Sequence, residues 1–279
     1  MSAEQMTARA GAAAGRRPAP RPSALRRRIS ALWPPVLLAA IIVAAWELIV
    51  DVFDISELTI AKPSAIVSEI GEMSSLLFDA TWITTQEIVY GFLLSAVVGA
   101  LLALVVARFA WLDRALYPLV VLFQNVPKVA LAPIFILWFG YGLTPKLLLV
   151  VVIAFFPVTV NMRAGLAAAD QDLLLLMRSV GASRWQVLSK IQIPTSLPYL
   201  FAGLRIAITF SVIGAIVAEF AGAQEGLGYL IQYGSTQLDT PLVFAALTFV
   251  SVLGLVLYYA LAGLEWLVQR RFPLPRADV

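Results

Sequence analysis

The residue types that most enzyme active sites depend on are absent from this chain of 279 residues. It contains no cysteine and no histidine, which excludes disulfides, thiolate nucleophiles, Ser-His catalysis and the commonest zinc ligands. No G-x4-G-K-S/T segment is present, so the chain cannot hold ATP as a P-loop does. Asp170 and Asp172 fit better as favourable charges at a helix N-terminus than as an acid/base pair. We therefore expect no catalytic residue, metal or cofactor; a membrane hydrolase built on carboxylates alone is the enzymatic alternative.

Polar side chains interrupt one long apolar stretch, residues 116–140, which also contains three prolines. Broken helices at membrane depth are tolerated where they are buried in protein or line a water-filled cavity, and an ionisable side chain there is a functional candidate. We predict that Gln124, Asn125 and Lys128 line the path of a polar or anionic solute, together with Glu219 farther along the chain. The alternative is structural: Lys128 reaches a lipid phosphate and the two amides cap the broken helix.

The composition predicts an all-α, polytopic membrane protein. Hydrophobic residues make up 61% of the chain and charged residues only 13%, against about half and a quarter in soluble domains. A basic tail, residues 1–32, has too little apolar surface to fold alone and is expected to be disordered. The transmembrane domain is predicted over 33–272, and its six runs of spanning length lie at about 33–52, 87–108, 116–140, 146–162, 198–220 and 242–268.

The lysines and arginines are distributed asymmetrically about these spans. Sixteen of the 20 lie in the tail, the 108–114 loop, the 163–197 loop and the C-terminus, whereas only Lys62 and Lys146 lie on the opposite side. The positive-inside rule therefore places both termini and the 163–197 loop in the cytoplasm. The net charge of +3 then needs no nucleic-acid partner. Within a span, Arg205 is expected to snorkel to the cytoplasmic interface.

Two spans carry small residues at every fourth position. Gly91, Ser95 and Gly99 form one stripe, and a second runs through Gly203, Ala207, Ser211 and Ala215. Such stripes allow backbones to approach closely in lipid, so we predict two packing faces in a tight bundle or dimer. A polar segment, 219–240, contains Gly226-Leu227-Gly228 and is expected to form a small external helix or a re-entrant turn.

The 170–198 loop predicts two short helices about a glycine. The first covers 173–180 and ends at Gly181, which can adopt positive φ. Ser183 and Gln186 have capping-box spacing and begin a second helix that is expected to run to about Lys190, where Pro194 stops the helix.

Gly181 and the Ile-Gln-Ile-Pro segment 191–194 resemble the EAA loop of bacterial ATP-binding cassette importer permeases, although Leu175, Leu176 and Met177 occupy the Glu-Ala-Ala positions. Four further segments, 126–140, 181–185, 197–205 and 225–231, resemble the permeases of the sulfonate/nitrate/taurine group. Some relatives in that group import pyrimidine vitamin precursors or riboflavin. The resemblance covers about 80–279.

The resemblance implies a permease subunit in the bacterial inner membrane, working as a homodimer with two ATPase subunits and an extracytoplasmic solute-binding protein. It implies that the loop couples to the ATPase through Met177, Arg178, Gly181, Ala182, Ser183, Arg184, Trp185, Gln186 and Pro194. Two other hypotheses stay open from the residues. An ion-coupled secondary transporter would bury carboxylates and often show inverted repeats, whereas a membrane scaffold would need no proline-broken polar span.

Overall fold

A computed structural model of the chain describes residues 24–109 and 125–271, together with residues 111, 112, 114, 115, 118 and 122. Side chains are described from residue 33 onward. Every element in these described residues is helical, which confirms the predicted all-α class. The chain divides into two compact units, Met1–Asp54 and Ile55–Val279, and each is described by itself.

The first unit contains one long helix. This helix, α2, covers Ala24–Val52 and therefore includes the last part of the segment expected as a disordered tail. Its apolar stretch Trp33–Val52 is long enough to cross a membrane. The rest of the predicted tail, residues 1–23, lies outside the described residues.

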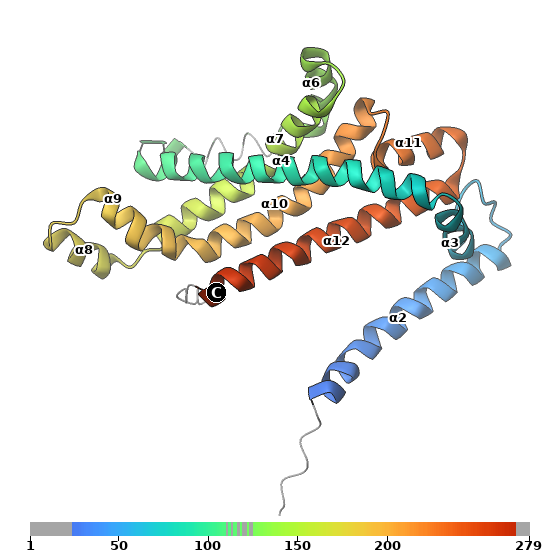
Figure 1. Cartoon of the computed structure of the whole chain (residues 1–279), viewed down its shortest axis with the longest axis horizontal. Coiled ribbons are helices and arrows are strands. Elements are labelled where there is room, and N and C mark those ends of the chain that lie inside the picture. Colours follow the sequence, from blue (N-terminus) through green and yellow to red (C-terminus); the bar gives the residue numbers. More distant parts are fainter. Residues whose placement is uncertain are drawn as a thin grey trace, which may run out of the picture. The chain divides into compact units, whose positions relative to one another are not determined.

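Four long helices form the body of the second unit (Figure 1). They are α4 (Ser74–Arg108), α7 (Leu143–Ala167), α10 (Ile193–Gly222) and α12 (Thr240–Arg271). Helix α7 packs against both α4 and α10, and α12 packs against α10 and α4. Each helix is longer than its predicted span. The largest extension is at α4, because the polar and amphipathic residues before 87 continue the same helix as far back as Ser74.

The two predicted small-residue stripes lie at the contacts between these helices. A Cβ at Gly91 would lie 2.5 Å from Val150, and one at Gly99 would lie 2.6 Å from the carbonyl oxygen of Phe155. At Gly203 the nearest atom would be the carbonyl oxygen of Pro157, at 2.9 Å. Both stripes therefore pack on α7, and their prediction as packing faces is confirmed.

The third predicted span is described mainly over its second half. A 3-10 turn, η1 (Lys128–Leu131), leads into α6 (Ala132–Phe139), which ends at Gly140 with φ of 75°. Pro127 has a ψ of 85° and is not helical, so the helix is broken there as the prolines predicted. The described residues thus contain five helices long enough to cross a membrane and one shorter apolar helix, Lys128–Phe139.

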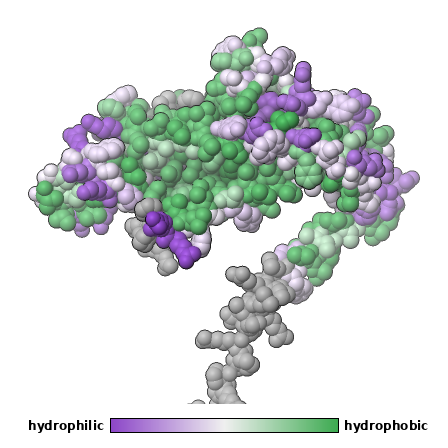
Figure 2. Space-filling model, in the orientation of Figure 1, coloured by the Kyte–Doolittle hydropathy of each residue, from purple (hydrophilic) through white to green (hydrophobic). Residues whose placement is uncertain are grey.

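Short helices lie at the two ends of the second unit. At one end are α8 (Gln171–Ser179) and α9 (Arg184–Val187), and at the other are α3 (Pro63–Glu72) and α11 (Leu227–Gln237) (Figure 1). Helix α11 confirms the short helix predicted within 219–240. Figure 2 shows an apolar surface over the long helices between these two more polar ends. This pattern is typical of a bundle that crosses a membrane.

Candidate functional site

The first of the two candidate regions is the loop that carries α8 and α9. Asp170 caps α8 by accepting a hydrogen bond from the backbone N–H of Asp172 at 2.9 Å, as the two acidic residues predicted. Gly181 ends the helix with φ of 74°, and the N–H of Ala182 donates to the carbonyl of Met177 at 2.9 Å. The predicted first helix and its glycine stop are confirmed.

The capping box at the start of α9 is also confirmed. The Ser183 hydroxyl accepts from the Gln186 N–H at 3.3 Å, and the Gln186 side chain accepts from the Ser183 N–H at 2.7 Å. The predicted stop at Pro194 is wrong. Helix α9 continues through the π-helical turn η2 (Leu188–Gln192) directly into α10, where Pro194 lies in the first turn. The wider π turn changes the backbone hydrogen-bond register, and a proline in a first helical turn needs no donor.

Apolar side chains are exposed on this loop. Leu173, Leu175, Leu176 and Val180 are exposed on and after α8, and Trp185 on α9 is 70% exposed. Their neighbours Arg178 and Arg184 are exposed as well. Clustered exposed apolar residues at a polar end of a molecule mark an interaction surface. We call these residues, 173–186, the loop surface.

The second candidate region is a buried polar cluster at the opposite end of the unit. Thr84 and Glu87 of α4, Lys146 of α7 and Glu219 of α10 form it; Thr84, Glu87 and Glu219 are each at most 2% exposed. The Lys146 ammonium lies 2.5 Å from Oε1 of Glu87. The Thr84 hydroxyl donates to Oε1 of Glu219 at 2.7 Å.

The same cluster holds the N-terminus of α11. The N–H of Leu227 donates to the Thr84 hydroxyl at 2.8 Å, and the N–H of Gly228 donates to Oε2 of Glu219. Two groups of hydrogen bonds, α4 with α7 and α4 with α10 and α11, therefore share helix α4. The sequence reading missed this arrangement, because it placed Lys146 in an outer loop and Glu87 at a span end. The Gly226-x-Gly228 pattern was the one available signal for a close backbone approach.

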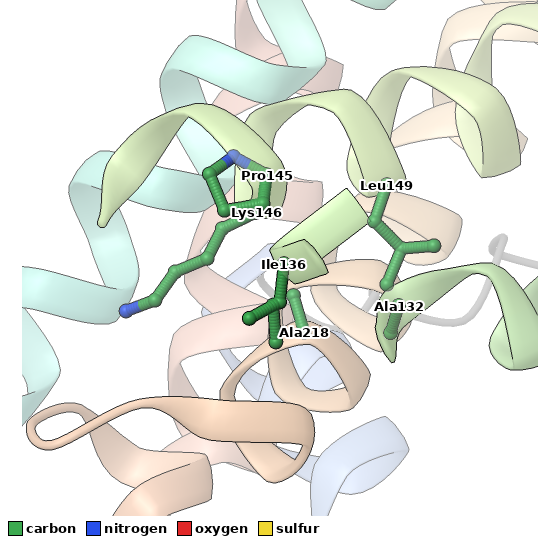
Figure 3. Close-up of a pocket in the computed structure, with 6 residues that line it drawn as sticks. All are labelled: Ala132, Ile136, Pro145, Lys146, Leu149 and Ala218. Atoms are coloured by element: carbon green, nitrogen blue, oxygen red, sulfur yellow. The ribbon is translucent and has the colours of Figure 1, made fainter. Parts of the chain in front are cut away.

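A small cavity adjoins Lys146 (Figure 3). Its other lining residues are apolar: Ala132, Ile136, Pro145, Leu149 and Ala218. The Lys146 side chain extends away from them, toward Glu87 of α4. The cavity holds about 10 Å³, room for at most one water. It is therefore too small to be a solute site.

The predicted path residues are separated in the structure. Lys128 is half-buried at the start of η1, and Asn125 is exposed on the other side of the break at Pro127. Gln124 lies outside the described residues. Glu219 is fully buried in the polar cluster and has hydrogen bonds to both carboxylate oxygens. The break at Pro127 is thus the part of the predicted path that the structure keeps exposed.

Arg205, which is expected to snorkel, has partners on another helix. Its guanidinium lies 2.6 Å from Glu265 of α12 and 6.0 Å from the centre of the Tyr258 ring. The ion pair joins α10 to α12, and the expected snorkelling of Arg205 stays a prediction.

The sequence matches the family described as binding-protein-dependent transport system inner membrane component over residues 95–270. The formylaminopyrimidine transport permease protein ThiX of Halalkalibacterium halodurans is 37% identical over 86% of this chain and 96% of its own length. The riboflavin transport system permease protein RibX of Chloroflexus aurantiacus is 34% identical over 85% of this chain and 91% of its own. The taurine transport system permease protein TauC of Escherichia coli is 26% identical over 86% of this chain and 92% of its own length.

The fold is similar to that of a solved transporter. The inward-facing MetNI methionine ABC transporter matches with a TM-score of 0.62 and 22% identity, over 71% of this chain and 98% of the matched chain. At that identity the likeness concerns the fold alone.

Proposed function

The chain belongs to the family of binding-protein-dependent transport system inner membrane components, and we propose that its solute is a small pyrimidine-like or related heteroaromatic compound. It is the membrane-spanning permease subunit of an ATP-binding cassette importer of the bacterial inner membrane. The observation that carries the choice of solute is the order of identities. Relatives named for formylaminopyrimidine and riboflavin share 37% and 34% of residues, whereas the taurine relative shares 26%.

A sulfonate is the second candidate solute. An aliphatic sulfonate permease, SsuC of Bacillus subtilis, is 32% identical over 78% of this chain. A sulfonate would also suit the cation of Lys128 at the break in the third span. The two solutes differ in charge and aromaticity, so one transport assay can separate them.

The test is ATP hydrolysis by the complete importer, reconstituted with its ATPase and its binding protein. We expect formylaminopyrimidine to stimulate hydrolysis and taurine to leave it at the basal rate. Riboflavin tests whether a larger ring system is accepted. Stimulation by taurine or an alkanesulfonate alone would replace the heteroaromatic solute with the sulfonate.

We place the solute path at the break beside Pro127. Lys128 and Asn125 flank this break, and Gln124 precedes it in the sequence. A non-helical backbone at membrane depth frees carbonyl oxygens that a solute with ring nitrogens and amino groups can contact. Glu219 contributes indirectly, because its carboxylate positions α11 instead of facing solvent.

The ATPase subunits bind at the loop surface. Trp185 and the arginines at 178 and 184 are exposed there, and side chains of these types dominate interface energies. Leu175, Leu176 and Met177 occupy the Glu-Ala-Ala positions of the family loop. The contact with the ATPase is therefore more hydrophobic than one made through a glutamate. The remaining contact residues are Gly181, Ala182, Ser183 and Gln186, with Pro194 at the base of the loop.

The assembly would contain two copies of this chain. Apolar side chains are exposed along α4 and α12, among them Leu94, Val97 and Leu255, and a second copy or lipid covers them. With both termini and the loop surface in the cytoplasm, α11 and α3 face the binding protein outside. The alternative function, an ion-coupled transporter, is supported only by the buried carboxylates of Glu87 and Glu219. Both of these bind other side chains of this chain, which weighs against their binding a coupling ion.

A further inference from the structure

One atom of the buried polar cluster lacks a partner. Oε2 of Glu87 is buried and makes no hydrogen bond with any described residue, although the whole side chain is only 2% exposed. The other oxygen, Oε1, accepts from Lys146. A buried acceptor without a donor is costly. An unsatisfied carboxylate oxygen in a native bundle therefore needs an explanation.

Glu219 has the opposite pattern. Both of its carboxylate oxygens accept hydrogen bonds, one from the Thr84 hydroxyl and one from the Gly228 N–H. It also lies at the N-terminus of α11, where the helix dipole favours a negative charge. Two donors and a helix N-terminus are the surroundings of an ionised carboxylate, which has only acceptors.

The two glutamates are neighbours. Thr84, which donates to Glu219, precedes Glu87 by three residues on α4 and therefore lies on the same face of that helix. Two ionised carboxylates have only acceptors, so neither can donate a hydrogen bond to the other. A proton on Oε2 of Glu87 would both satisfy that oxygen and supply the missing donor toward Glu219.

The charges of the cluster lead to the same assignment. Around the pair, α4 contributes the neutral Thr84, α7 contributes Lys146, and α11 contributes only backbone N–H groups; Glu225, just before α11, is exposed. Among the described residues that form the cluster, two carboxylates thus face one ammonium. An unpaired buried charge is far more costly than a neutral carboxyl group. One proton makes the cluster neutral.

We propose that Glu87 holds a proton on Oε2, and that the neutral cluster Glu87–Lys146–Glu219 with Thr84 clamps the N-terminus of α11 to α4 and α10. The glycines at the N-terminus of α11 allow this close contact. A Cβ at Gly226, where φ is 108°, would lie 2.5 Å from Cδ of Glu219, and one at Gly228 would lie 2.8 Å from its Cβ. Only a bare backbone can approach the carboxylate this closely.

The decisive test compares two matched substitutions in the full-length chain in lipid nanodiscs. In Glu87→Gln, the amide keeps an acceptor for Lys146 and replaces the proposed O–H with an N–H donor toward Glu219. In Glu219→Gln, one oxygen acceptor remains for two donors, the Thr84 hydroxyl and the Gly228 N–H, and the negative charge at the N-terminus of α11 is lost. Hydrogen exchange of the α11 amides reports whether the clamp holds. We expect the α11 amides of Glu87→Gln to keep the protection factors of the parent, and those of Glu219→Gln to have protection factors about tenfold lower. Glu225→Gln, an exposed glutamate beside α11, is the control.

Infrared spectroscopy adds a second readout. Infrared spectra of the parent should show a protonated carboxyl group that is missing from Glu87→Gln. This band is read in the parent itself, so the result does not depend on whether either variant keeps the clamp. Equal loss of protection in the two glutamine variants, or no protonated carboxyl in the parent, would overturn the proposal.

Discussion

The two ends of the unit Ile55–Val279 differ in which side chains they bury and which they expose. At the α3–α11 end, polar side chains are buried and bonded to one another, as Glu87–Lys146 and Thr84–Glu219 show. At the α8–α9 end, apolar side chains are exposed, and the hydrogen bonds are local ones between residues within a few positions of each other. The first end is held together by the chain itself. The second exposes the side chains that we propose bind the ATPase.

This contrast predicts different consequences for mutations at the two ends. Changes at the α3–α11 end should alter the stability of the permease, whereas changes at the α8–α9 end should alter association with the ATPase and leave the fold intact.

The largest effect is expected from Lys146→Met. It removes the one ammonium that balances the negative charge of the polar cluster, and leaving a buried charge without its partner costs about 3–5 kcal/mol. Thermal unfolding of the purified permease in detergent measures this loss. Lys190→Met, an exposed lysine at the opposite end, is the control and should unfold like the parent. Parent-like stability of Lys146→Met would remove the contrast between the ends.

Trp185→Ala should produce the next largest effect, on binding. An exposed tryptophan that anchors an interface contributes about 2 kcal/mol or more when it is truncated, or about thirtyfold in affinity. Copurification with the ATPase and its solute-stimulated hydrolysis measure the change. Trp82→Ala, another exposed tryptophan but on α4, should leave the association unaffected. If Trp185→Ala binds the ATPase as tightly as the parent, the loop surface is not the docking site.

Gly181→Val tests the turn within the loop surface. No atom lies within 4 Å of a Cβ built at Gly181, so the cost arises only from its φ of 74°. A β-branched residue there costs about 1–3 kcal/mol of local strain and should displace α9 from α8. Association with the ATPase should weaken by about tenfold while membrane insertion stays normal. Gly71→Val is the matched control, since it has equal space but no positive φ.

Lys128→Met should have a smaller effect, confined to uptake. The half-buried cation lies at the break in the third span, so its loss should raise the half-saturating solute concentration severalfold while the complex still assembles. Initial uptake rates over a range of solute concentrations measure this. Arg270→Met, near the C-terminus, serves as the control. Unchanged uptake would assign Lys128 to lipid head groups.

Single cysteines should report the orientation of the two ends, and the readout is labelling, since Ser183 also caps α9. The chain has no native cysteine. Ser64→Cys in α3 and Ser183→Cys before α9 are both at exposed positions. A membrane-impermeant maleimide should label Ser64→Cys from outside and Ser183→Cys only after permeabilisation. Labelling of both from one side would reverse the proposed topology.

The predictions from sequence were accurate where the interactions are local. Ser183 and Gln186 are three residues apart, and the turn at Gly181 depends on one backbone angle, so their chemistry is visible in the sequence. The apolar runs likewise predicted five of the helices that can cross a membrane. Ends of helices were less predictable, because α4 continues through polar residues that are stabilised by packing.

The polar cluster could not be predicted in the same way. Thr84 and Glu219 are 135 residues apart, and Glu87 and Lys146 are 59 apart. Only the packing of α4, α7 and α10 brings them together. The partner of Arg205 was missed for the same reason, since Glu265 of α12 is distant in the sequence. The π turn at Leu188–Gln192 was missed because a proline normally signals a helix end, and the sequence does not show how a wider turn accommodates it.

The continuous helix from α9 through η2 to α10 has a mechanical consequence. It covers Arg184–Gly222, 39 residues, and it bends between α9 and α10 (Figure 1). Trp185 lies near its first residue, and Glu219, to which α11 is bonded, lies near its last. Helix α10 alone has 30 residues and is about 45 Å long, so a tilt of about 5° about one end moves the other end by about 4 Å. If the ATPase binds the loop surface as we propose, a small displacement there is carried to Glu219 and α11 through one unbroken helical backbone.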